Sequence, residues 1–136
     1  MPSLILEGGT FRPIFSAGVM DALLDNNITF PYCIGVSAGI TNGVSYISKQ
    51  YKRNLEVIQN YRLDKRYLGL RNFFKCKSIF GIDFVFNEIP NNLVPFDMDT
   101  FKKYTGTAIA GVTNAVTGKI EYMDTKDLDD KNLILR

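Results

Sequence analysis

The sequence predicts a three-layer α/β/α fold in which a mainly parallel sheet lies between helices. Two short apolar runs, residues 4–6 and 32–36, each lead through a turn that contains glycine into a segment with helical spacing of apolar residues. This repeated order of strand, turn and helix is typical of parallel strands whose crossover helices cover both faces of a sheet. The composition, with 46% apolar and 22% charged residues, is that of an ordinary globular domain.

The first half of the chain predicts four elements. A strand is expected over residues 2–7 and a helix over residues 16–24, with Gly8-Gly9 breaking the chain between them. A second strand is expected over residues 32–36. The helix after it should begin at about residue 37 and end at about residue 51.

The second half is less regular. We expect a helix over residues 55–66 and an irregular excursion with short helices over residues 67–97. Residues 107–112 and 119–123 predict a hairpin, because a Thr-Gly turn signal lies between two strand-like runs. Another apolar element starts at residue 133. We therefore expect residues 1–136 to be the N-terminal part of a longer domain that is truncated at its C-terminus.

Several classes of protein do not fit the composition. No apolar run approaches the ~18 residues that a membrane span needs, and the N-terminus lacks the basic region of a secretory signal. Cys33 and Cys76 do not have the spacing of metal ligands, and they indicate a reduced, cytoplasmic setting. The motifs predict no cofactor and no metal, and they leave the oligomeric state open.

The chain contains no histidine. A Ser-His-Asp triad, a Cys-His pair and a zinc site with histidine ligands are therefore excluded within these residues. Acid–base chemistry here must use carboxylates, lysine or tyrosine.

The pentapeptide Gly35-Val36-Ser37-Ala38-Gly39 is the main candidate for catalysis. It follows a predicted strand and precedes a predicted helix, which is the context of a nucleophile elbow. Such a turn exposes the serine hydroxyl, and the flanking glycines, Gly35 and Gly39, allow strand, helix and substrate to approach closely. The alternative is a tight turn in which Ser37 only caps the helix.

A second candidate loop comprises Glu7-Gly8-Gly9-Thr10-Phe11-Arg12. Glycines between a strand and a helix free backbone N–H groups for an anion, and Arg12 could add a charged contact. The alternative is a plain tight turn. In a parallel sheet both loops emerge at the carboxyl ends of strands, where such folds place ligands. One loop would then supply a nucleophile and the other an oxyanion hole.

Residues 49–77 form a basic stretch. It holds nine basic and two acidic residues, a net charge of +7, interleaved with tyrosine and phenylalanine. An anionic membrane surface, nucleic acid and an ordinary solvated face each fit this pattern. We expect peripheral membrane contact rather than nucleic-acid binding, because no known nucleic-acid module occurs.

Taken together, the motifs resemble the patatin-like phospholipase family. The family's glycine-rich oxyanion loop is matched by residues 8–13 and its serine elbow by residues 35–39. The predicted hairpin over residues 108–122 resembles a strand-turn-strand of the family, and residues 67–71 and 80–83 resemble its bacterial members.

The resemblance implies a lipid acyl hydrolase with a Ser-Asp dyad. Ser37 would be the nucleophile, and the oxyanion hole would comprise the amides of Gly8, Gly9, Thr10 and Ala38, assisted by Arg12. The family's aspartate lies in an Asp-Gly turn, and no Asp-Gly pair occurs in this sequence. We therefore expect the catalytic aspartate to be absent and these 136 residues alone to be inactive.

Two residues depart from the family pattern. Thr10 stands where a third glycine is usual, and its Cβ disfavours a left-handed backbone by ~1–2 kcal/mol. Pro13 stands where another glycine is usual, and it has no N–H to donate. These departures motivate an alternative, a non-catalytic protein of the same fold that binds anionic lipid.

Overall fold

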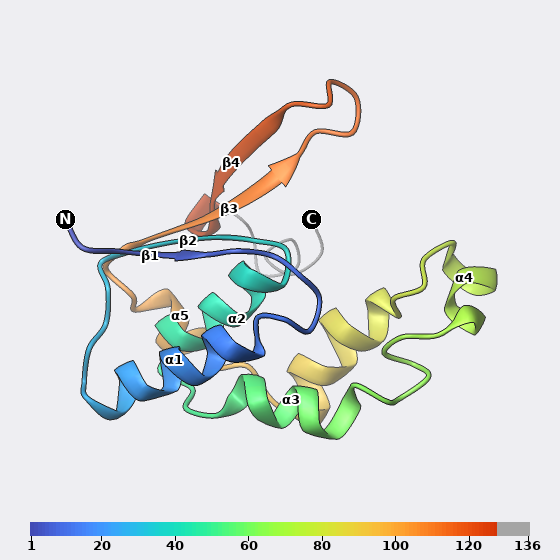
Figure 1. Ribbon diagram of the computed structural model, residues 1–136, viewed down its shortest axis with the longest axis horizontal. Coiled ribbons are helices and arrows are strands. Elements are labelled where there is room, and N and C mark those ends of the chain that lie inside the picture. Colours follow the sequence, from blue (N-terminus) through green and yellow to red (C-terminus); the bar gives the residue numbers. More distant parts are fainter. Residues whose placement is uncertain (128–136) are drawn as a thin grey trace.

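A four-stranded sheet organises the computed structural model, which describes residues 1–127 (Figure 1). Strands β1 (Ser3–Leu6), β2 (Tyr32–Val36) and β3 (Thr107–Thr113) are parallel. Strand β4 (Ile120–Asp124) pairs with β3 in the antiparallel direction. The α/β class is confirmed, and the sheet is mixed because β4 closes the predicted hairpin.

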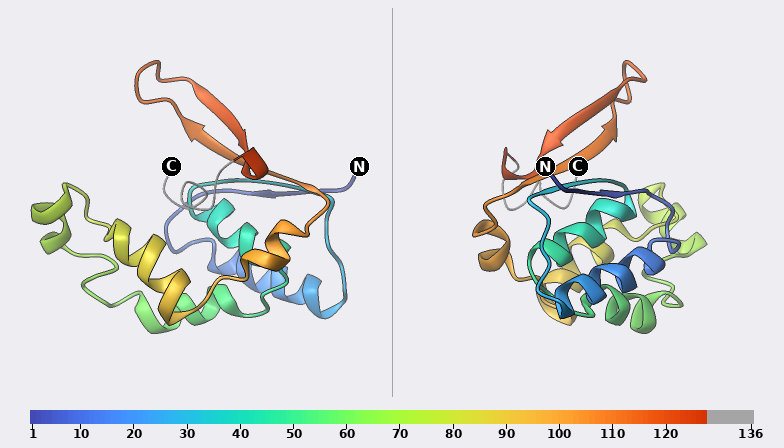
Figure 2. Two further views of the ribbon diagram at one scale, coloured as in Figure 1. Left: turned by 180° about the vertical axis from the view of Figure 1, so that it is seen from behind. Right: turned by 60° about the vertical axis from the view of Figure 1, so that its left-hand side comes forward.

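The α-helices and the π-helix of the described residues lie on one side of the sheet (Figures 1 and 2), whereas a short 3-10 turn, η2 (Thr125–Asp127), follows β4. They include α1 (Ile14–Asp25), α2 (Ala38–Ile47) and α3 (Arg53–Tyr61). Because side chains alternate along a strand, one face of the sheet carries every second residue. Leu4, Cys33 and Ala108 share one register and belong to the core with α1 and α2, whereas the row beside it begins with Ile5, which is 78% exposed.

The core packs α1 and α2 against the sheet. Its fully buried members include Ala17, Met20, Cys33 and Tyr46. The Tyr46 hydroxyl donates to the carbonyl of Ile28 at 2.9 Å and accepts from the amide of Phe30 at 3.2 Å. The buried hydroxyl therefore has hydrogen-bond partners, and it ties the loop before β2 to α2.

The segment between α3 and β3 is the irregular excursion that the sequence predicts. It contains α4 (Leu70–Cys76), the π-helix η1 (Phe84–Leu93) and α5 (Met98–Lys102). A second small core cluster holds η1 in place. Figure 1 shows α4 at one end of the molecule, away from the strands.

The bounds of α2 and α3 differ from those expected. Helix α2 ends at Ile47 rather than near residue 51, and α3 comprises residues 53–61 rather than 55–66. Lys49 and Lys52 have left-handed backbones, with φ of 57° and 58°, and these residues turn the chain between the two helices. The apolar element expected from residue 133 lies outside the described residues.

Candidate active site

Ser37 occupies a strained turn between β2 and α2. Its φ of 53° and ψ of −129° lie in a region that residues with a Cβ rarely adopt. Such strain persists only where the surrounding structure enforces it, and it concentrates at functional sites. Ser37 precedes α2, whose first residue is Ala38, so the unpaired amides of the first helical turn lie beside the serine.

Gly35 and Gly39 enforce this turn by close backbone approach. A Cβ on Gly35 would lie 2.5 Å from the amide nitrogen of Ile40. A Cβ on Gly39 would lie 2.5 Å from the carbonyl oxygen of Leu6, at the end of β1. The two glycines therefore let α2 pack directly against both strands.

The glycine-rich loop after β1 lies next to Ser37. A Cβ on Gly8 would lie 3.2 Å from the Cβ of Ser37. The amides of Gly8, Gly9 and Thr10 donate no hydrogen bond to any residue in the described part of the chain. Thr10 has a left-handed backbone with φ of 54°, despite its Cβ. The two predicted loops thus come together, with three unengaged amides near the serine.

Arg12 does not reach into this site. Its Nη2 donates to Oε1 of Glu7 at 2.8 Å, and both side chains are more than 70% exposed. The aliphatic part of Arg12 packs over Gly9, where a Cβ would lie 3.3 Å from it. Arg12 therefore neutralises Glu7 beside the loop, and it is the one predicted site residue whose side chain is engaged elsewhere.

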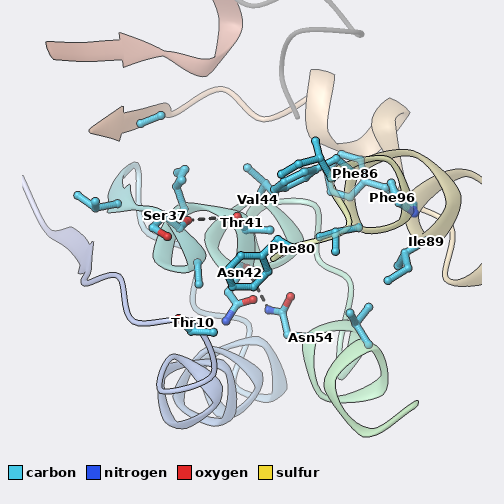
Figure 3. A pocket seen from close by; sticks show the side chains of 18 of the residues that line it. Thr10, Ser37, Thr41, Asn42, Val44, Asn54, Phe80, Phe86, Ile89 and Phe96 are labelled. Atoms are coloured by element: carbon cyan, nitrogen blue, oxygen red, sulfur yellow. Dashed lines mark hydrogen bonds between the residues drawn. The ribbon is translucent and has the colours of Figure 1, made fainter. Parts of the chain in front are cut away.

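A cavity of about 590 Å³ opens beside Ser37. Thr10, Ser37 and Ala38 line it, and Figure 3 shows Thr10 and Ser37 on one side of the site and Phe86 and Phe96 on the other. Most of the wall between them is aliphatic or aromatic. The apolar lining residues include Val36, Ile40, Val44, Val57, Ile58, Phe80, Ile82, Val85, Ile89 and Met123. The serine thus faces a cavity that suits an apolar ligand.

Several polar side chains of the cavity wall are held by hydrogen bonds within the protein. Asn54 donates to the backbone oxygen of Asn42 at 3.0 Å (Figure 3). Arg53 donates to the Ser45 hydroxyl at 3.0 Å and to the Val94 carbonyl at 2.9 Å. Burial lowers the pKa of the Arg53 guanidinium and raises the pKa of Tyr67, so the tyrosine stays neutral at ordinary pH.

The Ser37 hydroxyl makes no hydrogen bond with any residue from 1 to 127. The Thr41 hydroxyl donates to the backbone carbonyl of Ser37, at 3.1 Å. Asp129 and Asp130 lie outside the described residues. Within residues 1–127, no three potential metal ligands cluster together. No helix in this part of the chain is long and apolar enough to cross a bilayer.

Sequence reasoning missed the far wall of the cavity. Residues 67–97 were expected to form an irregular excursion with short helices, and nothing indicated that η1 would present Val85, Phe86 and Ile89 to the space beside α2. Their spacing gave no regular helical signal, because η1 is a π-helix and lacks the 3.6-residue period of an α-helix. It also contains Pro90. The apolar character of this segment was the one available clue.

Comparison with known proteins identifies the family. A family model described as patatin-like phospholipase matches residues 4–135. Protein YjjU of Escherichia coli K12, itself uncharacterized, is 29% identical over 99 residues, which is 72% of this chain and 28% of YjjU. The chain thus spans less than a third of the length of this relative, and no solved structure gives a significant match. Because the family model covers nearly the whole chain, this protein belongs to the patatin-like phospholipase family.

Proposed function

We propose that the protein hydrolyses carboxylic esters of lipids, with Ser37 as the nucleophile. The observation that carries this proposal is the strained backbone of Ser37 at the mouth of a largely apolar cavity. A serine that only capped a helix would need neither the strain nor the cavity, and no side-chain capping bond from Ser37 occurs in α2.

In the proposed reaction the Ser37 Oγ attacks the carbonyl carbon of the ester, and its proton passes to a general base. The oxyanion that forms accepts hydrogen bonds from the amides of Gly8, Gly9, Thr10 and Ala38. Loss of one such donor typically lowers turnover by ~10²–10³-fold.

The second half of the reaction regenerates the enzyme. Collapse of the tetrahedral intermediate expels the alcohol, which takes up the proton, and leaves an acyl ester on Ser37. Water, activated by the same base, then hydrolyses this ester to release the fatty acid. The family resemblance implies an aspartate as the base, and we propose that it lies outside residues 1–127.

The role of Arg12 in this proposal is indirect. It balances the charge of Glu7, at 2.8 Å, next to the amides that would hold the oxyanion. A carboxylate without this partner would oppose negative charge on the substrate. Arg12 is therefore a positioning residue rather than a catalytic one.

A fluorophosphonate probe tests the assignment of Ser37. The probe should add covalently to the full-length protein, and Ser37→Ala should abolish the adduct seen by intact mass. Ser3→Ala, which alters an exposed serine at the start of β1, is the matched control and should label fully. Full ester turnover by Ser37→Ala would refute the proposal.

A second function is a non-catalytic protein that binds anionic lipid. The observation that favours it is the Ser37 hydroxyl, which contacts no base among residues 1–127. Absence of labelling and of ester turnover in the full-length protein, together with intact lipid binding, would select this function.

A further inference from the structure

Residues 63–82, here called the arm, expose several large apolar side chains to solvent. Leu70, Phe73 and Phe74 lie on α4 at positions i, i+3 and i+4, so they share one helix face. They are 75%, 51% and 85% exposed. The arm also exposes Leu63 (85%), Ile79 (48%) and Ile82 (39%). Exposed apolar groups gathered in this way mark an interaction surface.

Most basic side chains of the arm form no ion pair with residues 1–127. Of the basic residues in the arm, Arg66 is paired with Asp64 at 2.8 Å and with Glu88 at 3.0 Å. Lys65, Arg71, Lys75 and Lys77 are exposed and form no ion pair with any residue among 1–127. The basic stretch seen in the sequence therefore divides, because Arg53 points into the protein whereas these four face solvent.

We propose that the arm docks the protein on an anionic lipid bilayer. The apolar side chains of α4 would enter the boundary between headgroups and acyl chains, while the flanking lysines would contact anionic headgroups. Nucleic acid fits less well. Phe73 and Phe74 could stack on bases, but the exposed leucines and isoleucines have no role in stacking.

The arm is built to hold this position. Gly69 and Gly81 donate backbone hydrogen bonds across it to Ile79 and Tyr67, at 2.9 and 3.0 Å. The side chain of Asn72 donates to three carbonyls within the arm, those of Lys65, Arg66 and Ile79. Because these hydrogen bonds already order the backbone of the arm, docking would cost little conformational entropy.

The arm also forms part of the cavity beside Ser37. Tyr67, Phe80 and Ile82 belong to both. A bilayer bound at α4 would therefore lie close to the cavity, and a lipid could pass from one to the other. This second step depends on the proposed lipid hydrolysis, whereas docking itself does not.

Vesicle co-sedimentation tests the docking with catalysis removed. The full-length protein carrying Ser37→Ala should bind phosphatidylcholine vesicles that contain phosphatidylglycerol more tightly than vesicles of phosphatidylcholine alone. Adding Phe73→Ser and Phe74→Ser should weaken this binding by at least ~10-fold, since one buried aromatic ring contributes about that much. The matched control is Phe15→Ser on α1, where the ring is 79% exposed but lies outside the arm.

Charge reversal provides a second test of docking. Lys75→Glu with Lys77→Glu should lower binding to the anionic vesicles by more than ~20-fold, because each lysine at such a surface contributes a factor of about five. Lys119→Glu, in the exposed hairpin turn, should bind as before. High salt should weaken the lysine contribution.

Three outcomes would overturn docking. These are equal binding to both vesicle types, unchanged binding of both arm variants, and binding to random oligonucleotides with none to vesicles. Circular dichroism identical to that of the parent protein confirms that the variants fold. If vesicle binding holds while Ser37 fails to label with fluorophosphonate, the docking stands and the hydrolysis proposal fails.

Discussion

Two neighbouring loops each hold a residue with a Cβ in a backbone conformation that favours glycine. Thr10 follows β1 with φ of 54°, and Ser37 follows β2 with φ of 53°. They lie side by side at the carboxyl ends of parallel strands, yet they are constrained differently. Around Ser37, added Cβ atoms on Gly35 and Gly39 would meet backbone atoms at 2.5 Å.

Around Thr10 the chain has more freedom. The three atoms nearest to an added Cβ on Gly9 all belong to the Arg12 side chain, the nearest at 3.3 Å, and that side chain is exposed. The serine turn is thus enforced by the packing of α2 on the sheet, whereas the glycine-rich loop is closed by a hydrogen bond from the Arg12 amide to the Gly9 carbonyl at 2.9 Å. In the reaction proposed above, the nucleophile would therefore be held more rigidly than the loop whose amides would bind the oxyanion.

The largest expected effect is at the serine turn. Gly39→Ala places a Cβ against the carbonyl oxygens of Leu6 and Glu7, at 2.5 and 2.6 Å, and neither can move without shifting β1. We expect the free energy of unfolding to fall by about 3 kcal/mol. Denaturant unfolding followed by circular dichroism measures it.

Gly18→Ala is the matched control for Gly39→Ala. It lies within α1, where an added Cβ meets no atom within 4 Å, and it should raise stability by about 0.5–1 kcal/mol. If Gly39→Ala were as stable as the parent protein, packing would not enforce the serine turn.

The sequence allowed much of this arrangement to be predicted. The glycines around Ser37 and after β1 identified two strand-to-helix turns, and the parallel order implied that they meet. Local signals of this kind need no tertiary information. The end of α2 was missed because Lys49 and Lys52 adopt left-handed backbones without glycine or proline to signal it.

The cavity could not be predicted in the same way. Its far wall depends on η1, which is held by Phe84, Ile89 and Val94 in a small cluster of its own. These contacts bring residues far apart in the chain together, and periodicity alone does not reveal them. Nor did the sequence show that Arg12 pairs with Glu7 rather than facing the serine.

A smaller effect is expected where the two loops touch. Gly8→Ala places a Cβ 3.1 Å from the Val36 carbonyl oxygen and 3.2 Å from the Ser37 Cβ, so the neighbours must give by a few tenths of an ångström. We expect a stability loss of only about 1 kcal/mol.

Reactivity should suffer more than stability in this variant. The fluorophosphonate labelling rate of Ser37 should fall about tenfold or more, because small misplacements at reacting groups are costly. Labelling at the parent rate with equal stability would mean that Gly8 does not set the position of the loop against the nucleophile.

The smallest effect, and the one that distinguishes the loops most directly, is at Thr10. Thr10→Gly relieves a left-handed backbone worth ~1–2 kcal/mol, and glycine gives back part of this through the entropy of the unfolded chain. The unfolding free energy should rise by roughly 0.5–1 kcal/mol. Thr105→Gly is the matched control, since Thr105 is exposed and its φ is not positive. It should lose stability by about the same amount. Opposite signs in the two variants would show that the glycine-rich loop stores strain locally. If both variants lost stability, the Thr10 conformation would have to be supported by packing, as the Ser37 turn is, and the two loops would then be alike.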